Sequence, residues 1–203
     1  MQIDIDTPRG PARAHLKLAE GSTAAIVLGH GAGGGIAAPD LVAAADAAIA
    51  QGVSVALVEQ PYRVAGRKAP APATQLDNSW LIVIANLLDG GLRDQRLIVG
   101  GRSMGARVAC RTAGGAGAVG VLCLAFPLAP PQRRGAKPAH SRLSELEAVT
   151  VPMLVLQGST DPFGLPPPAT HRRVVQVKGD HSLRADPDAI RQAVGSWLGD
   201  LLS

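Results

Sequence analysis

The stretch Gly100-Gly101-Arg102-Ser103-Met104-Gly105-Ala106-Arg107 decides the fold of this chain. An apolar run at residues 96–99 predicts a buried strand before it, and residues 106–113 can form a helix after it. A strand, an abrupt turn and a helix around Gly-x-Ser-x-Gly form a nucleophile elbow, which holds the serine hydroxyl clear of the sheet. Gly101 and Gly105 leave room where a Cβ would collide with neighbouring backbone. The stretch predicts Ser103 as a nucleophile, although a glycine-rich turn with an incidental serine also matches the pattern.

The remaining strand and helix signals alternate along the chain. A half-exposed strand is expected at residues 12–18, and a last helix at Pro187 with Asp186 as its N-cap. Apolar strands are expected at residues 24–28, 53–58, 96–99, 121–124, 152–156 and 173–177, and helices at 39–52, 79–88 and 106–113. This alternation predicts an α/β fold, a mostly parallel sheet with helices on both faces. Ligands of such sheets bind outside the carboxyl ends of the strands.

Length and composition fit one domain spanning residues 1–203, with 46% hydrophobic residues to build its core. Residues 1–6 carry acids rather than an apolar segment, and no apolar run reaches the roughly 18 residues of a membrane span. We therefore expect a cytoplasmic protein without a membrane partner. The sequence does not indicate an oligomeric state.

The charge and the cysteines exclude several further classes. The net charge of +4 comes from dispersed basic residues, and aromatic side chains for base stacking are scarce, so nucleic acid is not an expected partner. Cys110 and Cys123 have no Cys or His at ligand spacing, so we expect a buried, reduced pair and no metal or cofactor.

Two strand-end loops supply partners for Ser103. Asp161 follows the strand at 152–156, and His181 follows the strand at 173–177. The order Ser, Asp, His is the one found in α/β-hydrolases, and differs from that of chymotrypsin and subtilisin. In such a triad His181 takes the Ser103 proton and later protonates the leaving group, while Asp161 fixes the imidazole tautomer. Asp180 is too close to His181 in sequence to orient it and is interpreted as a turn residue.

The glycine loop at residues 29–35 allows two interpretations. Its Gly-x-Gly-x-x-Gly pattern follows a strand, and Glu59 ends the next one, as in a dinucleotide-binding domain. The helix, however, begins only near Pro39, and that interpretation leaves the three triad residues without a role. The hydrolase interpretation makes the loop an oxyanion hole, with backbone N–H groups from Ala32, Gly33 and Met104.

At this point the sequence resembles a known family. The matching stretches, which span nearly the whole chain, are His30-Gly31-Ala32-Gly33, Glu59-Gln60-Pro61-Tyr62-Arg63, residues 101–107, Asp161-Pro162-Phe163-Gly164 and Gly179-Asp180-His181-Ser182. They resemble the compact α/β-hydrolases grouped with the testis-expressed Tex proteins and non-specific-lethal complex subunit 3, and more distantly dienelactone hydrolase. The resemblance implies the fold and the triad Ser103, Asp161 and His181. Because chromatin members of the group look like scaffolds, a non-catalytic interaction module remains an alternative.

These observations favour a serine esterase or thioesterase acting on small acyl esters. Residues 125–142 are too few for a helical lid, so an open site is expected. Anionic esters are candidate substrates, because cationic side chains gather on two loops at the carboxyl edge. Those side chains are Arg63, Arg67, Lys68, Arg133, Arg134, Lys137 and Arg142.

Arg102 and Glu59 are expected to form a supporting ion pair beside the nucleophile. Arg102 directly precedes Ser103, and Glu59 ends a strand that should lie two places away at the same edge. A buried charge without a partner costs several kcal/mol, and Glu59 is the acid at the end of that strand.

Overall fold

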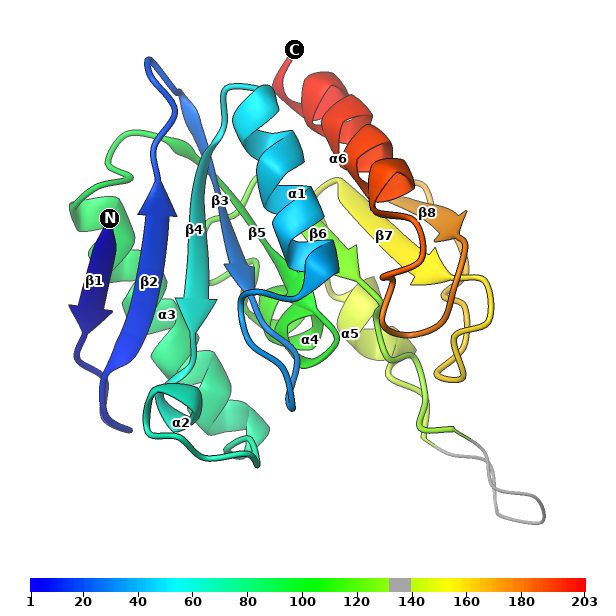
Figure 1. Ribbon diagram of the computed structural model, residues 1–203, viewed down its shortest axis with the longest axis horizontal. Coiled ribbons are helices and arrows are strands. Elements are labelled where there is room, and N and C mark those ends of the chain that lie inside the picture. Colours follow the sequence, from blue (N-terminus) through cyan, green and yellow to red (C-terminus); the bar gives the residue numbers. More distant parts are fainter. Residues whose placement is uncertain (132–139) are drawn as a thin grey trace.

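A computed structural model describes residues 1–131 and 140–203 (Figure 1). Eight strands form one sheet in the order β1-β2-β4-β3-β5-β6-β7-β8. The strands are β1 (Gln2–Ile5), β2 (Ala12–Lys17), β3 (Ala24–Gly29), β4 (Ser54–Glu59), β5 (Arg96–Arg102), β6 (Gly120–Leu124), β7 (Met153–Gly158) and β8 (Arg172–Val177). The helices are α1 (Pro39–Ala50), α2 (Pro61–Val64), α3 (Ala73–Asp89), α4 (Met104–Thr112), α5 (Leu143–Glu147) and α6 (Pro187–Leu202).

The direction of the strands gathers the functional loops at one edge. The pairings β1–β2 and β2–β4 are antiparallel, whereas every pairing from β4 across to β8 is parallel. The carboxyl ends of the parallel strands therefore meet at one edge, the lower one in Figure 1, next to α2. The loops that follow β3, β4, β5, β7 and β8 all start there.

Helices cover both faces of the sheet. In Figure 1, α1 and α6 lie in front of it, and α3, α4 and α5 lie behind it. The side chains of β3 alternate between the two cores: Ala25 and Val27 pack in the core with Trp80 of α3, and Ile26 packs with Leu41 of α1. A strand buried on both faces needs an unbroken apolar run, which explains the sequence of β3.

The α/β fold and its parallel strands are confirmed, with differences at the ends of elements. Helix α3 begins at Ala73, six residues before the expected start. The final helix begins at Pro187 as expected, and the Asp186 side chain accepts a hydrogen bond from the Ala189 N–H at 3.0 Å. The sequence analysis does not predict β1, α2 or α5, which are short segments of four or five residues.

The two cysteines lie where the apolar-pair interpretation puts them. Cys110 on α4 and Cys123 on β6 are both buried free thiols, with 3.4 Å between their Sγ atoms. The neighbouring thiol of Cys110 and burial raise the pKa of Cys123. The Cys123 thiol therefore keeps its proton, and both buried side chains pack in the core between α4 and β6.

Candidate active site

Ser103 stands at a strained turn between β5 and α4. Its backbone has φ 53° and ψ −107°, in the region of positive φ that non-glycine residues rarely adopt. Its N–H donates to the Leu124 carbonyl at 2.8 Å, which ties the turn to β6. A Cβ on Gly101 would lie 2.5 Å from the Gly29 carbonyl oxygen, and one on Gly105 would meet the same oxygen. Both glycines are thus required by the close approach of β3.

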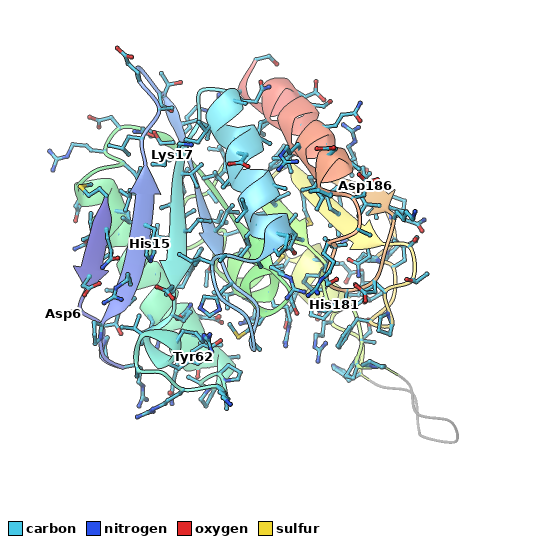
Figure 2. The ribbon with its side chains drawn as sticks, viewed as in Figure 1. Asp6, His15, Lys17, Tyr62, His181 and Asp186 are labelled. Carbon is cyan, nitrogen blue, oxygen red and sulfur yellow. The ribbon has the colours of Figure 1, made fainter. Side chains whose placement is uncertain are left out.

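Three side chains from different loops form one hydrogen-bonded row. His181 Nε2 lies 2.9 Å from Ser103 Oγ, and His181 Nδ1 lies 2.8 Å from Asp161 Oδ2. Since a carboxylate only accepts, Nδ1 carries the proton that it donates to Asp161. Nε2 is then free to accept the Ser103 hydroxyl proton. Figure 2 shows His181 at the carboxyl edge of the sheet, below the N-terminal end of α1.

The Asp161 carboxylate is held by groups that the sequence analysis does not identify. Its side chain is 1% exposed. Gln157 Nε2 donates to Oδ2 at 2.8 Å, and the Phe163 N–H donates to Oδ1 at 2.9 Å. The ring of Phe163 also packs on the imidazole of His181, with 4.4 Å between ring centroids. A polar residue at the end of an otherwise apolar strand was the sequence signal for Gln157.

The expected ion pair between Arg102 and Glu59 is wrong. Arg102 Nε instead lies 2.9 Å from Asp40 Oδ2, and Arg102 Nη2 donates to the His181 carbonyl at 3.0 Å. Glu59 lies 3.0 Å from His15 on the neighbouring strand β2. Asp40, and not Glu59, is the partner of Arg102 because the loop after β3 leads into α1 beside the elbow. The first turn of α1, which carries Asp40, therefore lies next to Arg102.

Asp40 is more deeply buried than Glu59, with 0% of its side chain exposed against 25% for Glu59. Burial raises the pKa of the Asp40 carboxyl, while the charge of Arg102 and the Leu41 N–H act in the opposite direction. Arg102 therefore connects three parts of the site: the start of α1, the elbow and the loop that carries His181.

The loop after β3 is fastened to the end of β4. The Tyr62 hydroxyl donates to the Ala32 carbonyl at 2.8 Å, and burial raises the pKa of Tyr62 to about 12, so the hydroxyl keeps its proton. His30 accepts from the Gln60 N–H through Nε2 at 3.1 Å, and its Nδ1 donates to the Gly31 carbonyl at 2.8 Å. These bonds fix the backbone of the expected oxyanion loop.

The backbone N–H groups that are expected to form the oxyanion hole come from two parts of the chain, the loop after β3 and the start of α4. Ala32 and Gly33 belong to the fastened loop, and Met104 is the first residue of α4, whose N–H has no acceptor within its own helix. The Tyr62 hydroxyl also lies 3.9 Å from Met104 Sδ, so the loop and the start of α4 are neighbours.

His30 is expected to make the free energy of unfolding dependent on pH. Burial lowers the pKa of His30 in the folded protein. When the pH falls below about 6.5, His30 binds a proton in the unfolded chain but stays neutral in the folded one. The contribution of His30 to the free energy of unfolding is therefore fully present above that pH. It decreases as the pH falls further, by at most about 1.4 kcal/mol per pH unit. We expect His30→Gln to flatten this slope in thermal unfolding followed across pH. The same change at exposed His140 serves as the control, and an equal slope in wild type and His30→Gln would contradict the assignment.

The other expected site residues are placed as follows. Arg63 is half-buried on α2, next to Tyr62. Arg142 donates to the Pro127 carbonyl at 2.7 Å, within its own loop. Arg133, Arg134 and Lys137 lie outside the described residues. Asp180 accepts from the N–H and the hydroxyl of Ser182, as a turn residue does.

The described residues contain no cluster of three or more His, Cys, Asp or Glu side chains that could hold a metal ion. Across residues 1–131 and 140–203, no helix has the length and apolar character needed to cross a membrane.

A parallel sheet with a serine elbow after β5, and with acid and histidine loops after β7 and β8, defines the α/β-hydrolase class. The chain belongs to the family described as alpha/beta hydrolase domain, which matches residues 22–188. This family match excludes the interpretation of residues 29–35 as the glycine loop of a dinucleotide-binding domain. No curated protein matches the sequence.

Solved structures of hydrolases share this fold over nearly its whole length. XC6422 from Xanthomonas campestris, described as an α/β serine hydrolase without a lid, is 18% identical over 98% of this chain and 94% of its own, with a TM-score of 0.73. Dienelactone hydrolase from Anabaena variabilis is 16% identical, with coverages of 98% and 96% and a TM-score of 0.77. Est1E from Butyrivibrio proteoclasticus is 12% identical, with coverages of 99% and 98% and a TM-score of 0.76. The expected likeness to dienelactone hydrolase is confirmed for the fold, whereas the grouping with Tex proteins stays a prediction.

Proposed function

We propose that the protein is a serine hydrolase that cleaves small acyl esters or thioesters through an acyl-enzyme on Ser103. The observation that carries the proposal is the continuous row from Ser103 Oγ through His181 to the buried Asp161 carboxylate. A serine hydroxyl alone is a weak nucleophile, and a neighbouring base that is itself oriented by a carboxylate activates it. A scaffold protein would not need this arrangement.

The reaction follows from the positions of these groups. Ser103 Oγ attacks the acyl carbon while His181 Nε2 takes the hydroxyl proton, and the imidazolium is stabilised by Asp161. The N–H groups of Met104 and of Ala32 or Gly33 stabilise the negative oxygen of the tetrahedral intermediate. His181 then protonates the leaving alcohol or thiol, and a water activated by the same imidazole releases the acid.

An open site suits substrates with short acyl groups. The described part of the chain between β6 and α5 contains no helix, and XC6422 is described as lacking a lid. Long lipids, which need an enclosed apolar cavity, are therefore poor candidates. A preference for anionic esters stays a prediction, carried by the exposed cations of the loop after α2.

A fluorophosphonate probe tests this function without a known substrate. We expect the wild-type protein to be labelled at Ser103, with the mass increase found on the peptide that contains it, because the probe reacts with activated serines. Ser103→Ala should remain unlabelled while keeping its circular dichroism spectrum and Tm. An unlabelled wild-type protein with this fold would favour the non-catalytic interaction module instead.

A further inference from the structure

Gln157 is a fully buried amide at the end of an apolar strand. It lies in β7, where the four residues before it, 153–156, are all buried and apolar. In Figure 1, this end of β7 reaches the lower edge of the sheet, between β6 and β8. Gln157 is itself 0% exposed. A buried polar side chain lowers stability unless its hydrogen-bonding groups are paired, so an apolar residue would suit this position better if packing alone decided it.

The amide nitrogen of Gln157 donates to acceptors in two loops. Nε2 lies 2.8 Å from Asp161 Oδ2, 2.9 Å from the Gly164 carbonyl oxygen and 3.1 Å from the Phe126 carbonyl oxygen. All three partners are acceptors, so the nitrogen of the amide, and not its oxygen, faces them. An NH₂ group has only two hydrogens, and the nearest acceptor is the charged carboxylate, which therefore takes the strongest bond.

The amide oxygen of Gln157 is left without a partner. Oε1 is buried and has no hydrogen-bond partner among the described residues. An unpaired buried acceptor lowers stability, so a side chain chosen for stability alone would avoid it. A side chain that has to place a donor on a carboxylate would be retained in spite of this cost. The unpaired oxygen is therefore consistent with a functional use of the nitrogen.

We propose that Gln157 is a positioning residue, which holds the Asp161 carboxylate in the orientation that His181 requires. The inference rests on the proposed hydrolase function. Asp161 Oδ2 accepts from both Gln157 Nε2 and His181 Nδ1, at 2.8 Å each, while Oδ1 accepts from the Phe163 N–H. Among the described residues, Gln157 is the only side chain besides His181 that donates to this carboxylate. Without it, one backbone N–H and the imidazole would be left to hold the carboxylate.

Replacement of Gln157 should affect kcat and not KM. Gln157 has no exposed surface, so it does not contact a substrate and acts through Asp161 and His181. A misplacement of about 1 Å at a catalytic group can cost about 10²-fold in rate. We therefore expect Gln157→Leu, which removes the amide from a side chain of similar size, to lower kcat for a short chromogenic ester about 10²-fold. KM should stay within about threefold of the wild-type value.

Two further variants separate positioning from a general loss of packing. Gln157→Asn keeps the amide on a shorter side chain that no longer reaches Asp161, and should lose kcat as well. Val155→Ala is the control, since Val155 is also 0% exposed and points to the same face of β7. It should lower stability but leave kcat within about threefold of wild type. All variants are compared at a temperature at which circular dichroism shows them to be folded.

A double variant tests whether Gln157 acts through Asp161. In the Asp161→Ala background, Gln157→Leu should cause no further loss of kcat, because the carboxylate that it positions is already absent. Losses that multiply would overturn the proposal. A kcat of Gln157→Leu within threefold of wild type, or a loss equal to that of Val155→Ala, would overturn it too.

The protein without substrate offers a second readout. The proton that His181 Nδ1 donates to the Asp161 carboxylate should resonate far downfield in the ¹H NMR spectrum, and its absence from His181→Ala assigns it. Gln157→Leu should shift or broaden this resonance, because the carboxylate is held less firmly, whereas Val155→Ala should not. An unchanged resonance in Gln157→Leu would overturn the proposal. A changed resonance in a protein that hydrolyses no ester would support the positioning and contradict only the proposed hydrolase function.

Discussion

Replacement of His181 by alanine is expected to lower kcat for a short chromogenic ester by at least about 10⁴-fold. Without the imidazole, Ser103 Oγ has no hydrogen-bonded base among the residues that the structure describes, and the hydroxyl remains a weak nucleophile. Asp161→Asn should lose about 10⁴-fold as well, because an amide cannot stabilise the imidazolium and can hold the ring in the wrong tautomer. The effects should not add: Ser103→Ala combined with His181→Ala should be no slower than either alone.

Asp180 provides a matched control for Asp161. It is an exposed acid next to His181 in sequence, but its carboxylate is used by Ser182. Asp180→Asn should therefore leave kcat within about threefold of wild type. Two results would contradict the assignment of Ser103, His181 and Asp161 as the catalytic residues. One is a kcat of His181→Ala above one tenth of the wild-type value, and the other is a similar loss of kcat in Asp161→Asn and Asp180→Asn.

A large loss of stability is expected when Arg102, which forms an ion pair with Asp40, is replaced. Arg102→Met leaves the Asp40 carboxylate, which is 0% exposed, without its counter-charge, and should destabilise the protein by about 3 kcal/mol. Asp40→Asn should cost less, because the Arg102 side chain is 18% exposed and keeps contact with water. Denaturant unfolding of both variants measures the difference.

The pH dependence of Arg102→Met has a defined sign. Without Arg102, the folded-state pKa of Asp40 rises further above the unfolded value of about 3.9. The stability deficit should thus be small in acid and grow as pH rises through the folded-state pKa of Asp40. Arg191→Met, which breaks an exposed pair with Asp188, is the control and should change stability by less than about 1 kcal/mol at any pH.

A double variant separates stability from positioning. Asp40→Asn in the Arg102→Met background removes the unpaired charge and should recover most of the lost stability. It should not recover kcat, since the hydrogen bond from Arg102 to the His181 carbonyl is still absent. Full recovery of both would mean that Arg102 acts on the site only through the fold.

The elbow, the parallel strands and the triad residues were predictable because their signals are local or follow from topology. Gly101 and Gly105 flank the serine within one turn, and the carboxyl ends of parallel strands meet at one edge whatever the loop lengths. Asp161 and His181 follow two of those ends directly. Their catalytic roles stay predictions until the variants are measured.

The partner of Arg102 was not predictable by the same reasoning. Glu59 was the nearest acid by strand order, but its side chain pairs with His15 on β2. The true partner, Asp40, is reached only through the path of the glycine loop, which strand periodicity does not describe.

The spread of the candidate site along the chain has a consequence for how activity arises during folding. Ser103 and His181 are separated by 78 residues, and their loops meet only after β5, β6, β7 and β8 have paired in parallel. Such long-range pairings form slowly compared with local helices. On refolding, helical circular dichroism should therefore return before the ability to react with an active-site probe. Probe reactivity would then report the last stage of assembly, when the final strands close the sheet.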